Sequence, residues 1–284
     1  MELHQLRYAL AVVDTGSFTA AAAAVNVSQS GVSTQVQKLE RELGVSLFDR
    51  SARRVTPSPE SERLIPAFRT ALTAVDAVGE AAADLRGLVT GSLRAGTVTG
   101  LAWPRFFDGL ADLQRDHPGI DIRLNEGTSD QILSSVRRGE SDLAIAAWSG
   151  REPAGLRSAV VFDDAIVAVV SPRHPWATRR SIRPAELNDA ALISLPVGTG
   201  ARAALDAILP AVRPRWEVST PSFIESLAAR GLGVGIVSET TAEGWSGVRT
   251  VPIAATAARS QLGVVWRGDP TLATRALLDR LLPD

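Results

Sequence analysis

Residues 17–44 have the sequence SFTAAAAAVNVSQSGVSTQVQKLERELG, which predicts two helices joined by a tight turn. Ser17 and Ser28 can each cap a helix, because a serine hydroxyl accepts a hydrogen bond from an N–H group of the first turn. Asn26 tolerates the backbone angles that a turn requires, and Gly44 suits the end of the second helix. Apolar residues of the second helix step by four, three and four, so they form one stripe toward a core. They are Val32, Val36, Leu39 and Leu43.

The opposite face of the second helix begins with short polar side chains and continues with cations. Such a face suits the major groove of DNA, since short polar groups approach base edges while cations and a helix N-terminus favour phosphate. The predicted DNA contacts on this helix are Ser28, Gln29, Ser30, Ser33, Thr34, Gln37 and Lys38. The pattern alone leaves an alternative open, an ordinary helical hairpin whose polar face meets water.

The hairpin and its flanks closely resemble the N-terminal winged helix-turn-helix of LysR-type transcriptional regulators. The resemblance runs without a gap from about Leu6 to Val55. It rests on Ser17-Phe18, Ala21-Ala22, Ser28-Gln29, Val32-Ser33, Val36, Leu39-Glu40, Leu43-Gly44, Leu47-Phe48 and Arg50. Ser30 and Thr34 stand where the family usually has Pro and Arg, and residues 57–61 (PSPES) replace its usual Leu-Thr-Glu-Ala-Gly. The change at Thr34 affects the expected operator sequence but not the expected module.

A first helix over residues 3–15 is expected to support the hairpin, and a wing is expected to follow it. Residues 47–50 and 53–55 are predicted to be the two short strands of the wing. Its tip carries cations at the height of the DNA backbone or minor groove, which adds Arg50, Arg53 and Arg54 to the predicted DNA contacts. Plain solubility is the alternative role for an arginine pair in a turn.

The composition limits the class of protein. The chain has 284 residues, no cysteine and a formal net charge of −1. This length favours two or three domains, and the absence of cysteine excludes disulfides and thiolate metal sites. No apolar run reaches membrane-span length and no signal core follows the start, so a cytoplasmic protein without membrane contact is expected. The near-neutral charge favours a specific DNA binder with few phosphate contacts per subunit, which depends on dimerisation for affinity.

A long helix is predicted over residues 58–90, with Ser58 as its cap and Pro59 at its first position. Pro66 is expected to bend the helix. Apolar residues alternate steps of four and three over three heptads, which is typical of a coiled coil. They are Leu64, Phe68, Ala71, Val75, Val78, Ala82 and Leu85. Packing of this seam on its own chain is the alternative, but a homodimer is favoured, and two-fold symmetry then implies an operator that is an interrupted palindrome.

From residue 91 short apolar strands alternate with helices, which predicts an α/β fold with parallel sheet wrapped by helices. A second series begins at Ala165. The last strand and helix have no partner in that series, so they are placed on the first sheet, with crossovers near Asp163 and Ala258. The predicted domains are residues 1–57, 58–90 and 91–284, the last divided into lobe I (91–163 plus 259–284) and lobe II (164–258).

This half of the chain resembles the LysR-type effector domain, a two-lobed fold similar to periplasmic binding proteins. The matching stretches are residues 91–96, 139–145, 174–177 and 231–235, although Ser238 replaces the usual proline. The resemblance implies a regulator in which a small metabolite, bound between the lobes, changes the grip on DNA of a dimer or tetramer. Tetramers follow from the resemblance alone, and RNA polymerase is a further partner that it allows.

Ligands of open parallel sheets bind beyond the carboxyl ends of the strands. Hydroxyls and helix N-termini at those ends suit a small effector, for which an organic anion is one candidate, with Arg202 assisting and Trp148 covering an apolar portion. The predicted effector contacts are Thr97, Thr99, Gly100, Thr128, Ser129, Trp148, Pro196, Val197, Gly198, Thr199, Arg202, Thr220 and Phe223. Helix capping is the alternative role for each single Ser or Thr.

No catalytic residue, metal site or cofactor is expected. His117 and His174 each precede a proline in a turn, where a solvated or capping histidine is the simpler interpretation. The sequence has no metal-ligand spacing, phosphate loop or nucleophile elbow. Three rivals to the regulator remain: an exported solute-binding protein, which would need a signal sequence; an enzyme, which would need an acid–base pair in the cleft; and a regulator without an effector.

Overall fold

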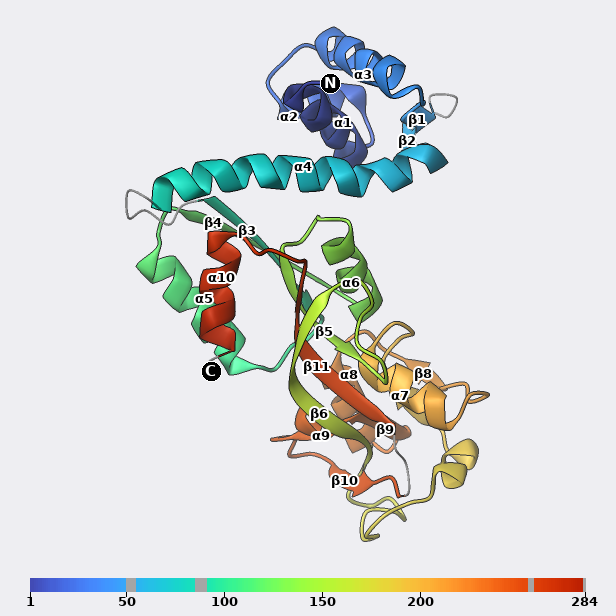
Figure 1. The fold of residues 1–284 in the computed structure, drawn as a ribbon. Helices are drawn as coiled ribbons and strands as arrows, with labels where there is room; N and C mark the ends of the chain where they lie inside the picture. Colours follow the sequence, from blue (N-terminus) through green and yellow to red (C-terminus); the bar gives the residue numbers. More distant parts are fainter. Residues whose placement is uncertain (50–54, 85–90, 255–257, 283–284) are drawn as a thin grey trace. The chain divides into compact units, whose positions relative to one another are not determined.

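The computed structural model describes residues 1–49, 55–84, 91–254 and 258–282 of the chain (Figure 1). The chain forms two compact units. The first comprises Met1–Leu88 with Arg138–Glu140, and the second comprises Val89–Arg137 with Ser141–Asp284. Among the described residues no helix has both the length and the apolarity needed to cross a membrane.

The first unit begins with the three predicted helices, α1 (Leu3–Thr15), α2 (Phe18–Ala24) and α3 (Gln29–Leu43). Both predicted caps are confirmed. The Ser17 hydroxyl accepts a hydrogen bond from the N–H of Ala20, and the Ser28 hydroxyl accepts one from the N–H of Gly31 at 3.1 Å. Asn26 makes the turn with a φ of 55°, and Gly44 ends α3 with a φ of 71°. The stripe of α3 is buried in the core shared by these helices, as its spacing predicts.

The wing contains a two-stranded ribbon in which β1 (Phe48–Asp49) pairs antiparallel with β2 (Thr56–Pro57). Residues 53 and 54 of the predicted second strand lie outside the described residues, and Val55 comes directly before β2. Ser58 determines this register, because its N–H donates to the Leu47 carbonyl at 3.0 Å and its hydroxyl donates to the Ser46 carbonyl at 2.6 Å. Pro57 is tolerated at the edge of a two-stranded ribbon, where a strand needs no second partner. The predicted DNA contacts Arg50, Arg53 and Arg54 lie outside the described residues.

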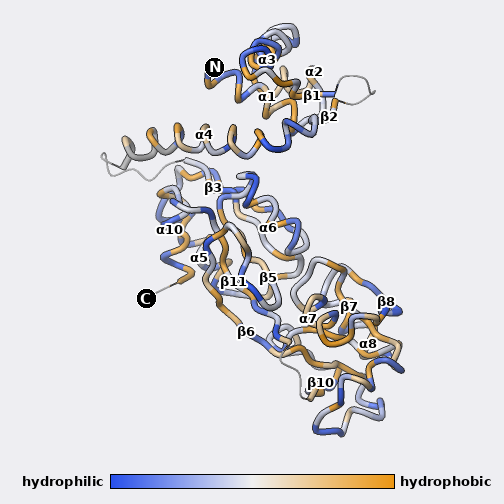
Figure 2. Tube along the Cα trace, turned by 45° about the vertical axis from the view of Figure 1, so that its right-hand side comes forward, coloured by the Kyte–Doolittle hydropathy of each residue, from blue (hydrophilic) through white to orange (hydrophobic). Residues whose placement is uncertain are grey.

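The long helix α4 (Pro59–Asp84) starts where its sequence predicts, with the Ser58 hydroxyl accepting from the N–H of Ser61 at 3.1 Å. Apolar residues recur along it (Figure 2). The first part of the predicted dimer seam packs on its own chain: Phe68 is 5% exposed in the core of the first unit, and Leu64 and Ala71 are half-buried against that core.

Packing on the same chain, the alternative to a dimer contact, therefore describes Leu64, Phe68 and Ala71. The first turns of α4 cover the core of the three-helix domain. Farther along, Val78 is 70% exposed, Ala82 is exposed and Val75 is half-buried. These three residues stay a predicted dimer contact. Leu85 lies outside the described residues.

The second unit is built on one mixed sheet. Its described strands follow the order β4-β3-β5-β11-β6-β9-β7-β8, and β10 pairs with β6. The first βαβ series alternates strands and helices as predicted, and its elements are β3 (Gly91–Val98), α5 (Pro104–Asp116), β4 (Ile120–Gly127), α6 (Ser129–Arg137) and β5 (Leu143–Trp148). The elements of the second series are β7 (Leu192–Ser194), α7 (Gly200–Ile208), β8 (Trp216–Glu217), α8 (Pro221–Ala229) and β9 (Val234–Ser238). Within each series the strands pair in parallel, as expected.

Two long strands join the series, and here the expectation of a parallel sheet is wrong. β6 (Arg157–Val170) and β11 (Arg259–Trp266) pair antiparallel over the whole length of β11. β11 also pairs with β5, which confirms that the last strand returns to the first sheet. The far end of β6 pairs with β9 and with β10 (Arg249–Pro252). β6 therefore runs through both parts of the sheet (Figure 1), and the predicted strand beginning at Ala165 is only its second half.

The remaining elements cover or connect this sheet. They are a 3-10 helix (Pro184–Asp189), α9 (Glu239–Ala242) and α10 (Leu272–Leu281), and the first two were not predicted. Helix α10 packs with α5 over the core of the first series. The lobe boundaries at residues 163 and 259 stay a prediction.

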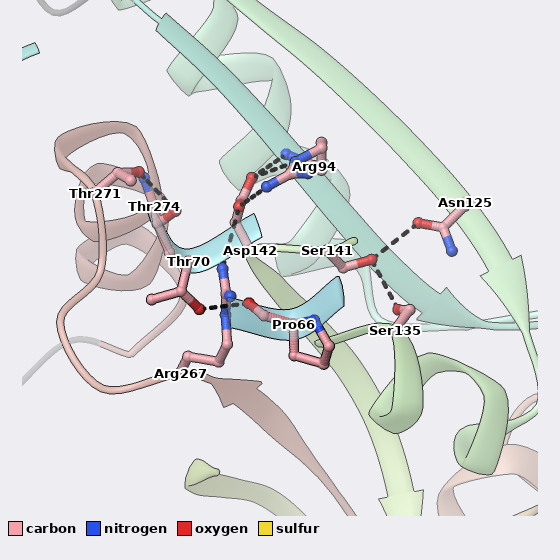
Figure 3. A network of polar contacts seen from close by, with 10 residues as sticks. All are labelled: Pro66, Thr70, Arg94, Asn125, Ser135, Ser141, Asp142, Arg267, Thr271 and Thr274. Carbon is pink, nitrogen blue, oxygen red and sulfur yellow. Dashed lines mark hydrogen bonds and ion pairs between the residues drawn. The ribbon is translucent and has the colours of Figure 1, made fainter. Parts of the chain in front are cut away.

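A network of polar contacts fixes the start of β5 against β3 (Figure 3). Asp142 is 8% exposed, and its carboxylate accepts hydrogen bonds from the backbone N–H of Arg94 at 2.8 Å and from the Arg94 guanidinium at 2.7 Å. The Arg267 guanidinium lies 4.0 Å from the same carboxylate. Next to it, the Ser141 hydroxyl lies 2.9 Å from that of Ser135. These contacts set the register that brings the carboxyl ends of β3 and β5 to one edge.

Candidate functional site

The predicted DNA-contacting residues of α3 lie on one exposed face of the helix. Gln29, Ser30, Thr34, Gln37 and Lys38 are exposed, and Ser33 is half-buried. This face is opposite the buried stripe, so its side chains are available to a groove of DNA. The Ser28 hydroxyl already accepts the capping hydrogen bond from Gly31 and lies 3.2 Å from the Ser30 hydroxyl. The main role of Ser28 is therefore to cap α3, and its hydroxyl has less hydrogen-bonding capacity left for a DNA base.

Two residues of α1 line a groove beside this face that the sequence did not indicate. His4 and Tyr8 lie there together with Ser30, Thr34 and Gln35. The His4 ring nitrogen Nε2 lies 3.3 Å from Gln35 Oε1, which also accepts from the Gln5 amide at 3.0 Å. The periodicity of α3 contains no signal for them, because α1 meets α3 only in the folded domain.

The second unit contains a cavity of about 300 Å³. Four groups of residues make up most of its wall: the segments after β3 and β4, the first turns of α7 and α8, the crossover strands β6 and β11, and the end of β9 with α9. The lining residues are Val98, Thr99, Gly100, Leu101, Ala102, Gly127, Thr128, Ser129, Gln131, Ala147, Phe162, Asp164, Leu195, Pro196, Thr199, Gly200, Ala201, Ser219, Pro221, Ser238, Thr240, Thr241, Ser260 and Leu262. The cavity lies at the carboxyl ends of the parallel strands, where the rule for open α/β sheets expects a ligand.

Six of the predicted effector contacts line this cavity. They are Thr99, Gly100, Thr128, Ser129, Pro196 and Thr199. One of them, Thr128, also has the capping role that was its alternative, while Ser129 ties the start of α6 to β5. The Thr128 hydroxyl accepts weakly from the N–H of Gln131 at 3.4 Å, and the Ser129 hydroxyl accepts from the N–H of Ala147 at 3.0 Å. The hydroxyls of Thr128 and Ser129 thus make hydrogen bonds within the protein and also line the cavity.

The other predicted contacts do not line the cavity. Thr97 and Trp148 are buried inside the unit, Trp148 in the core beneath α6. Val197 and Phe223 are exposed on the surface, and Gly198 and Thr220 are not among the lining residues. The predicted contacts were all residues near strand ends, whereas only some residues at those ends line this cavity, so an effector role for these six stays a prediction.

Arg202, the one predicted cation of the effector site, is engaged elsewhere. Its guanidinium bonds Asp206 Oδ1 at 2.9 Å and Glu217 Oε2 at 2.8 Å, and it does not line the cavity. Burial lowers the pKa of Arg202, but the hydrogen bonds to Asp206 and Glu217 outweigh it, so the pKa is raised. A guanidinium held in two ion pairs is not free to bind an anionic effector.

The crossover strands supply four lining residues that the sequence analysis missed. Ser260 pairs with Asp164 and Leu262 pairs with Phe162 in the antiparallel ladder between β11 and β6. Because side chains alternate across a strand, positions two apart share a face, and all four face the cavity. The available signal was the placement of two crossovers near Asp163 and Ala258, because a chain that passes twice between the two series has residues beside any cavity between them.

The walls of the cavity approach each other closely at two places. A Cβ atom on Gly100, whose φ is +74°, would lie 2.9 Å from Pro221 Cδ. The N–H of Asp130, in the first turn of α6, donates to the Gly198 carbonyl at 3.1 Å. These contacts bring the first and second βαβ series together around the cavity, so a ligand in it would touch both.

The chemistry of the lining favours a small ligand with an apolar part and several hydrogen-bonding groups. Phe162, Leu195, Pro196 and Leu262 offer apolar surface, and serine and threonine hydroxyls surround it. The first turns of α7 and α8 belong to the wall, and neither has a side-chain cap hydrogen bond. Among the described residues no group of His, Cys, Asp and Glu could hold a metal ion.

Comparison with protein families matches nearly the whole chain. Residues 3–62 match the model described as "Bacterial regulatory helix-turn-helix protein, lysR family", and residues 86–283 match "LysR substrate binding domain". Among curated proteins, the chain is 29% identical over 244 residues to the HTH-type transcriptional activator CmpR of Synechocystis sp., covering 83% of this chain and 78% of that protein. It is 36% identical over 177 residues to a probable hydrogen peroxide-inducible genes activator of Mycobacterium xenopi, covering 62% and 93%.

Solved structures of full-length regulators share the fold. The chain aligns to a cysteine-substituted variant of full-length OxyR from Pseudomonas aeruginosa with a TM-score of 0.77 and 25% identity, covering 99% of this chain and 94% of that one. It aligns to full-length CbnR, solved with its target DNA, with a TM-score of 0.59 and 21% identity, covering 99% of each chain.

Proposed function

Because the chain belongs to the LysR family of DNA-binding transcriptional regulators, we propose that it binds an operator as a dimer and senses a small molecule in the cavity of its second unit. It is a regulator and not an enzyme. The operator is an interrupted palindrome, read by α3 of each subunit from the face that carries Gln29 and Lys38. We place this activity in the cytoplasm, where the operator is, and further assembly into a tetramer belongs to the same proposal.

The observation that supports the sensing part is the position of the cavity. Thr99 and Thr128 line it from the first βαβ series, Thr199 lines it from the second, and Asp164 lines it from the strand that joins them. A ligand that touches all of these favours one arrangement of the two series over another. That preference is what a population shift requires, and the shifted arrangement changes how the subunits hold DNA.

Thiol oxidation is excluded as the signal. Relatives in Mycobacterium are named as probable hydrogen peroxide-inducible genes activators, but this chain contains no cysteine, and its one methionine is Met1. A dithiol switch needs two cysteine sulfurs. A bound ligand is the signal we propose instead, and treatment with hydrogen peroxide is expected to leave DNA affinity unchanged.

The first test is fluorescence anisotropy of the purified protein on the DNA that flanks its own gene, with a scrambled duplex as control and two salt concentrations. Sequence-dependent binding supports the proposed regulator and provides the assay for an effector screen. Equal, weak binding to both duplexes contradicts it. The cavity is tested in the same assay with Thr128→Trp, whose large ring enters from a half-buried wall position. An effector that acts on the wild type should fail to act on this variant.

A further inference from the structure

Asp164 is the only charged residue among the described residues that line the cavity. The remaining lining is made of apolar side chains, hydroxyls, glycines and one amide, that of Gln131. The Gln131 amide oxygen already accepts the N–H of Thr128 at 2.9 Å. The cavity thus contains one fixed negative charge and no side-chain cation from the described part of the chain.

The Asp164 carboxylate is held in place with part of its bonding capacity unused. Its Oδ2 accepts the N–H of Thr240 at 3.2 Å, while Oδ1 has no hydrogen bond to any residue that the structure describes. An ionised carboxylate accepts up to about four hydrogen bonds. Asp164 is half-buried on β6 and directly opposite Ser260 on β11, so its position is set by the sheet rather than by a loop.

Capping of α9 is the competing role for Asp164, since Thr240 is in the first turn of that helix. This role needs one acceptor oxygen and no charge, which an asparagine would also supply. It does not explain why the charge faces the cavity between Phe162 and Ser260. Removing a carboxylate from water costs free energy unless the charge is compensated, and a cation in the ligand would compensate it.

From this geometry we infer that the effector carries a positively charged nitrogen, an ammonium or amidinium group, that binds Asp164, and an apolar part that packs on Phe162 and Leu262. The inference rests on the proposed function, because it assumes that the effector occupies this cavity. This cationic ligand replaces the organic anion that we expected from the sequence. Arg202, the residue expected to bind that anion, is paired with Asp206 and Glu217. Hydroxyls of the opposite wall, such as that of Thr99, complete the hydrogen bonding of the ligand.

The test uses the full-length chain and two matched sets of probes. Each set has one carbon frame and three head groups: 2-phenylethylamine, 2-phenylethanol and phenylacetate; and butylamine, butan-1-ol and butyrate. Dissociation constants are measured by ligand-observed NMR titration for the wild type, Asp164→Asn, Asp163→Asn and Thr128→Trp. Asp163→Asn is the matched control, because this neighbour on β6 bonds Arg259 and does not line the cavity. Melting temperature and DNA affinity confirm that each variant is folded.

The expected result is that the amine binds more tightly than the alcohol and the acid of the same frame. Asp164→Asn should weaken amine binding about 10- to 100-fold, the range for a hydrogen bond to a charged group, and Asp163→Asn should leave it unchanged. Preference for the acid or the alcohol, no measurable binding of either amine, or equal effects of the two aspartate variants would each overturn the inference.

Thr128→Trp separates this inference from the proposed function. If the acids bind to the wild type and Thr128→Trp abolishes their binding, the cavity is the ligand site and only the inferred charge of the effector is wrong. If Thr128→Trp leaves the binding of every probe unchanged, the probes bind elsewhere, and the assignment of the cavity as the effector site fails as well.

Discussion

Replacing Gly200 by alanine should lower the stability of the second unit through one added methyl group. Gly200 begins α7 and is buried against the sheet. A Cβ atom there would lie 2.7 Å from Ala147 Cβ and 2.9 Å from Ser260 Oγ. Carbon atoms in ordinary contact are about 3.5–4.0 Å apart, so α7 or β5 must move by about 1 Å. Overpacking of this kind costs about 1–3 kcal/mol.

An opposing effect is smaller. Replacing glycine by alanine reduces the conformational entropy of the unfolded chain, which stabilises by about 0.4–1 kcal/mol where the native backbone permits it. The steric cost exceeds this gain, and each 1 kcal/mol lowers the melting temperature by about 2–4 °C in a unit of this size. The difference between the two ranges is a net cost of up to about 2.6 kcal/mol, which predicts a fall of up to about 10 °C. A smaller ligand affinity should accompany the fall, since Ala147 and Ser260 both line the cavity.

Thermal unfolding followed by circular dichroism measures the effect on the full-length chain. Gly268→Ala is the matched control, because a Cβ atom at Gly268 meets no atom within 4 Å. Its melting temperature should equal or slightly exceed that of the wild type. The steric reasoning is refuted if Gly200→Ala melts at or above the temperature of Gly268→Ala.

Four further outcomes are expected. Gln29→Ala should reduce the preference for operator over scrambled DNA by about 1–3 kcal/mol in anisotropy titrations, whereas Lys38→Ala should weaken both duplexes alike; equal patterns would contradict this division. Val78→Asp should lower the dimer fraction in sedimentation, because this 70% exposed side chain is apolar; an unchanged fraction would exclude Val78 from the seam. Asp142→Ala should destabilise the chain by about 2–4 kcal/mol in urea unfolding, since it removes the buried partner of Arg94; a cost below that of an exposed Asp121→Ala would count against it. The Arg179 guanidinium and the Arg183 N–H lower the pKa of Glu186 from 4.5 to about 2, so its contribution is present above pH 4.5 and lost as the pH falls through about 2; Glu186→Gln should therefore flatten that part of the stability–pH curve measured by melting temperature.

Features determined by nearby residues could be predicted from the sequence. The caps Ser17, Ser28 and Ser58, the turn at Asn26 and the end of α3 at Gly44 each depend on residues within four positions along the chain. They formed where the pattern indicated. The same holds for the helices and parallel strands of the two βαβ series, whose apolar runs and boundaries are local signals.

Features determined by residues far apart in the chain could not be predicted from the sequence. The antiparallel ladder between β6 and β11 joins residues about a hundred positions apart, and Asp163-Asp164 interrupts the apolar run that would have indicated one long strand. The apolar heptad positions of α4 could pack against a partner subunit or against the helices of the same chain. Periodicity does not show which of these surfaces buries Phe68. For Arg202 a local signal existed: Asp206 lies four residues later on the same helix, which is the spacing of an ion pair, and this should have removed the arginine from the predicted cleft.

The two kinds of cavity contact have different consequences for signalling. A ligand shifts an equilibrium only by the difference in its affinity for the two states. Asp164 lies on the strand that joins the two series, so the inferred ion pair with it is expected whether the walls are close or apart. Thr128 and Thr199 lie on opposite walls, so a ligand bonds both only when the walls are close. The backbone hydrogen bond between the walls, from Asp130 to Gly198, contributes about 1 kcal/mol, which a ligand bridging the walls can exceed. If the effector occupies this cavity as proposed, we expect Asp164 to supply affinity and the wall hydroxyls to supply the preference for one state, so that variants of the two separate ligand binding from the DNA response.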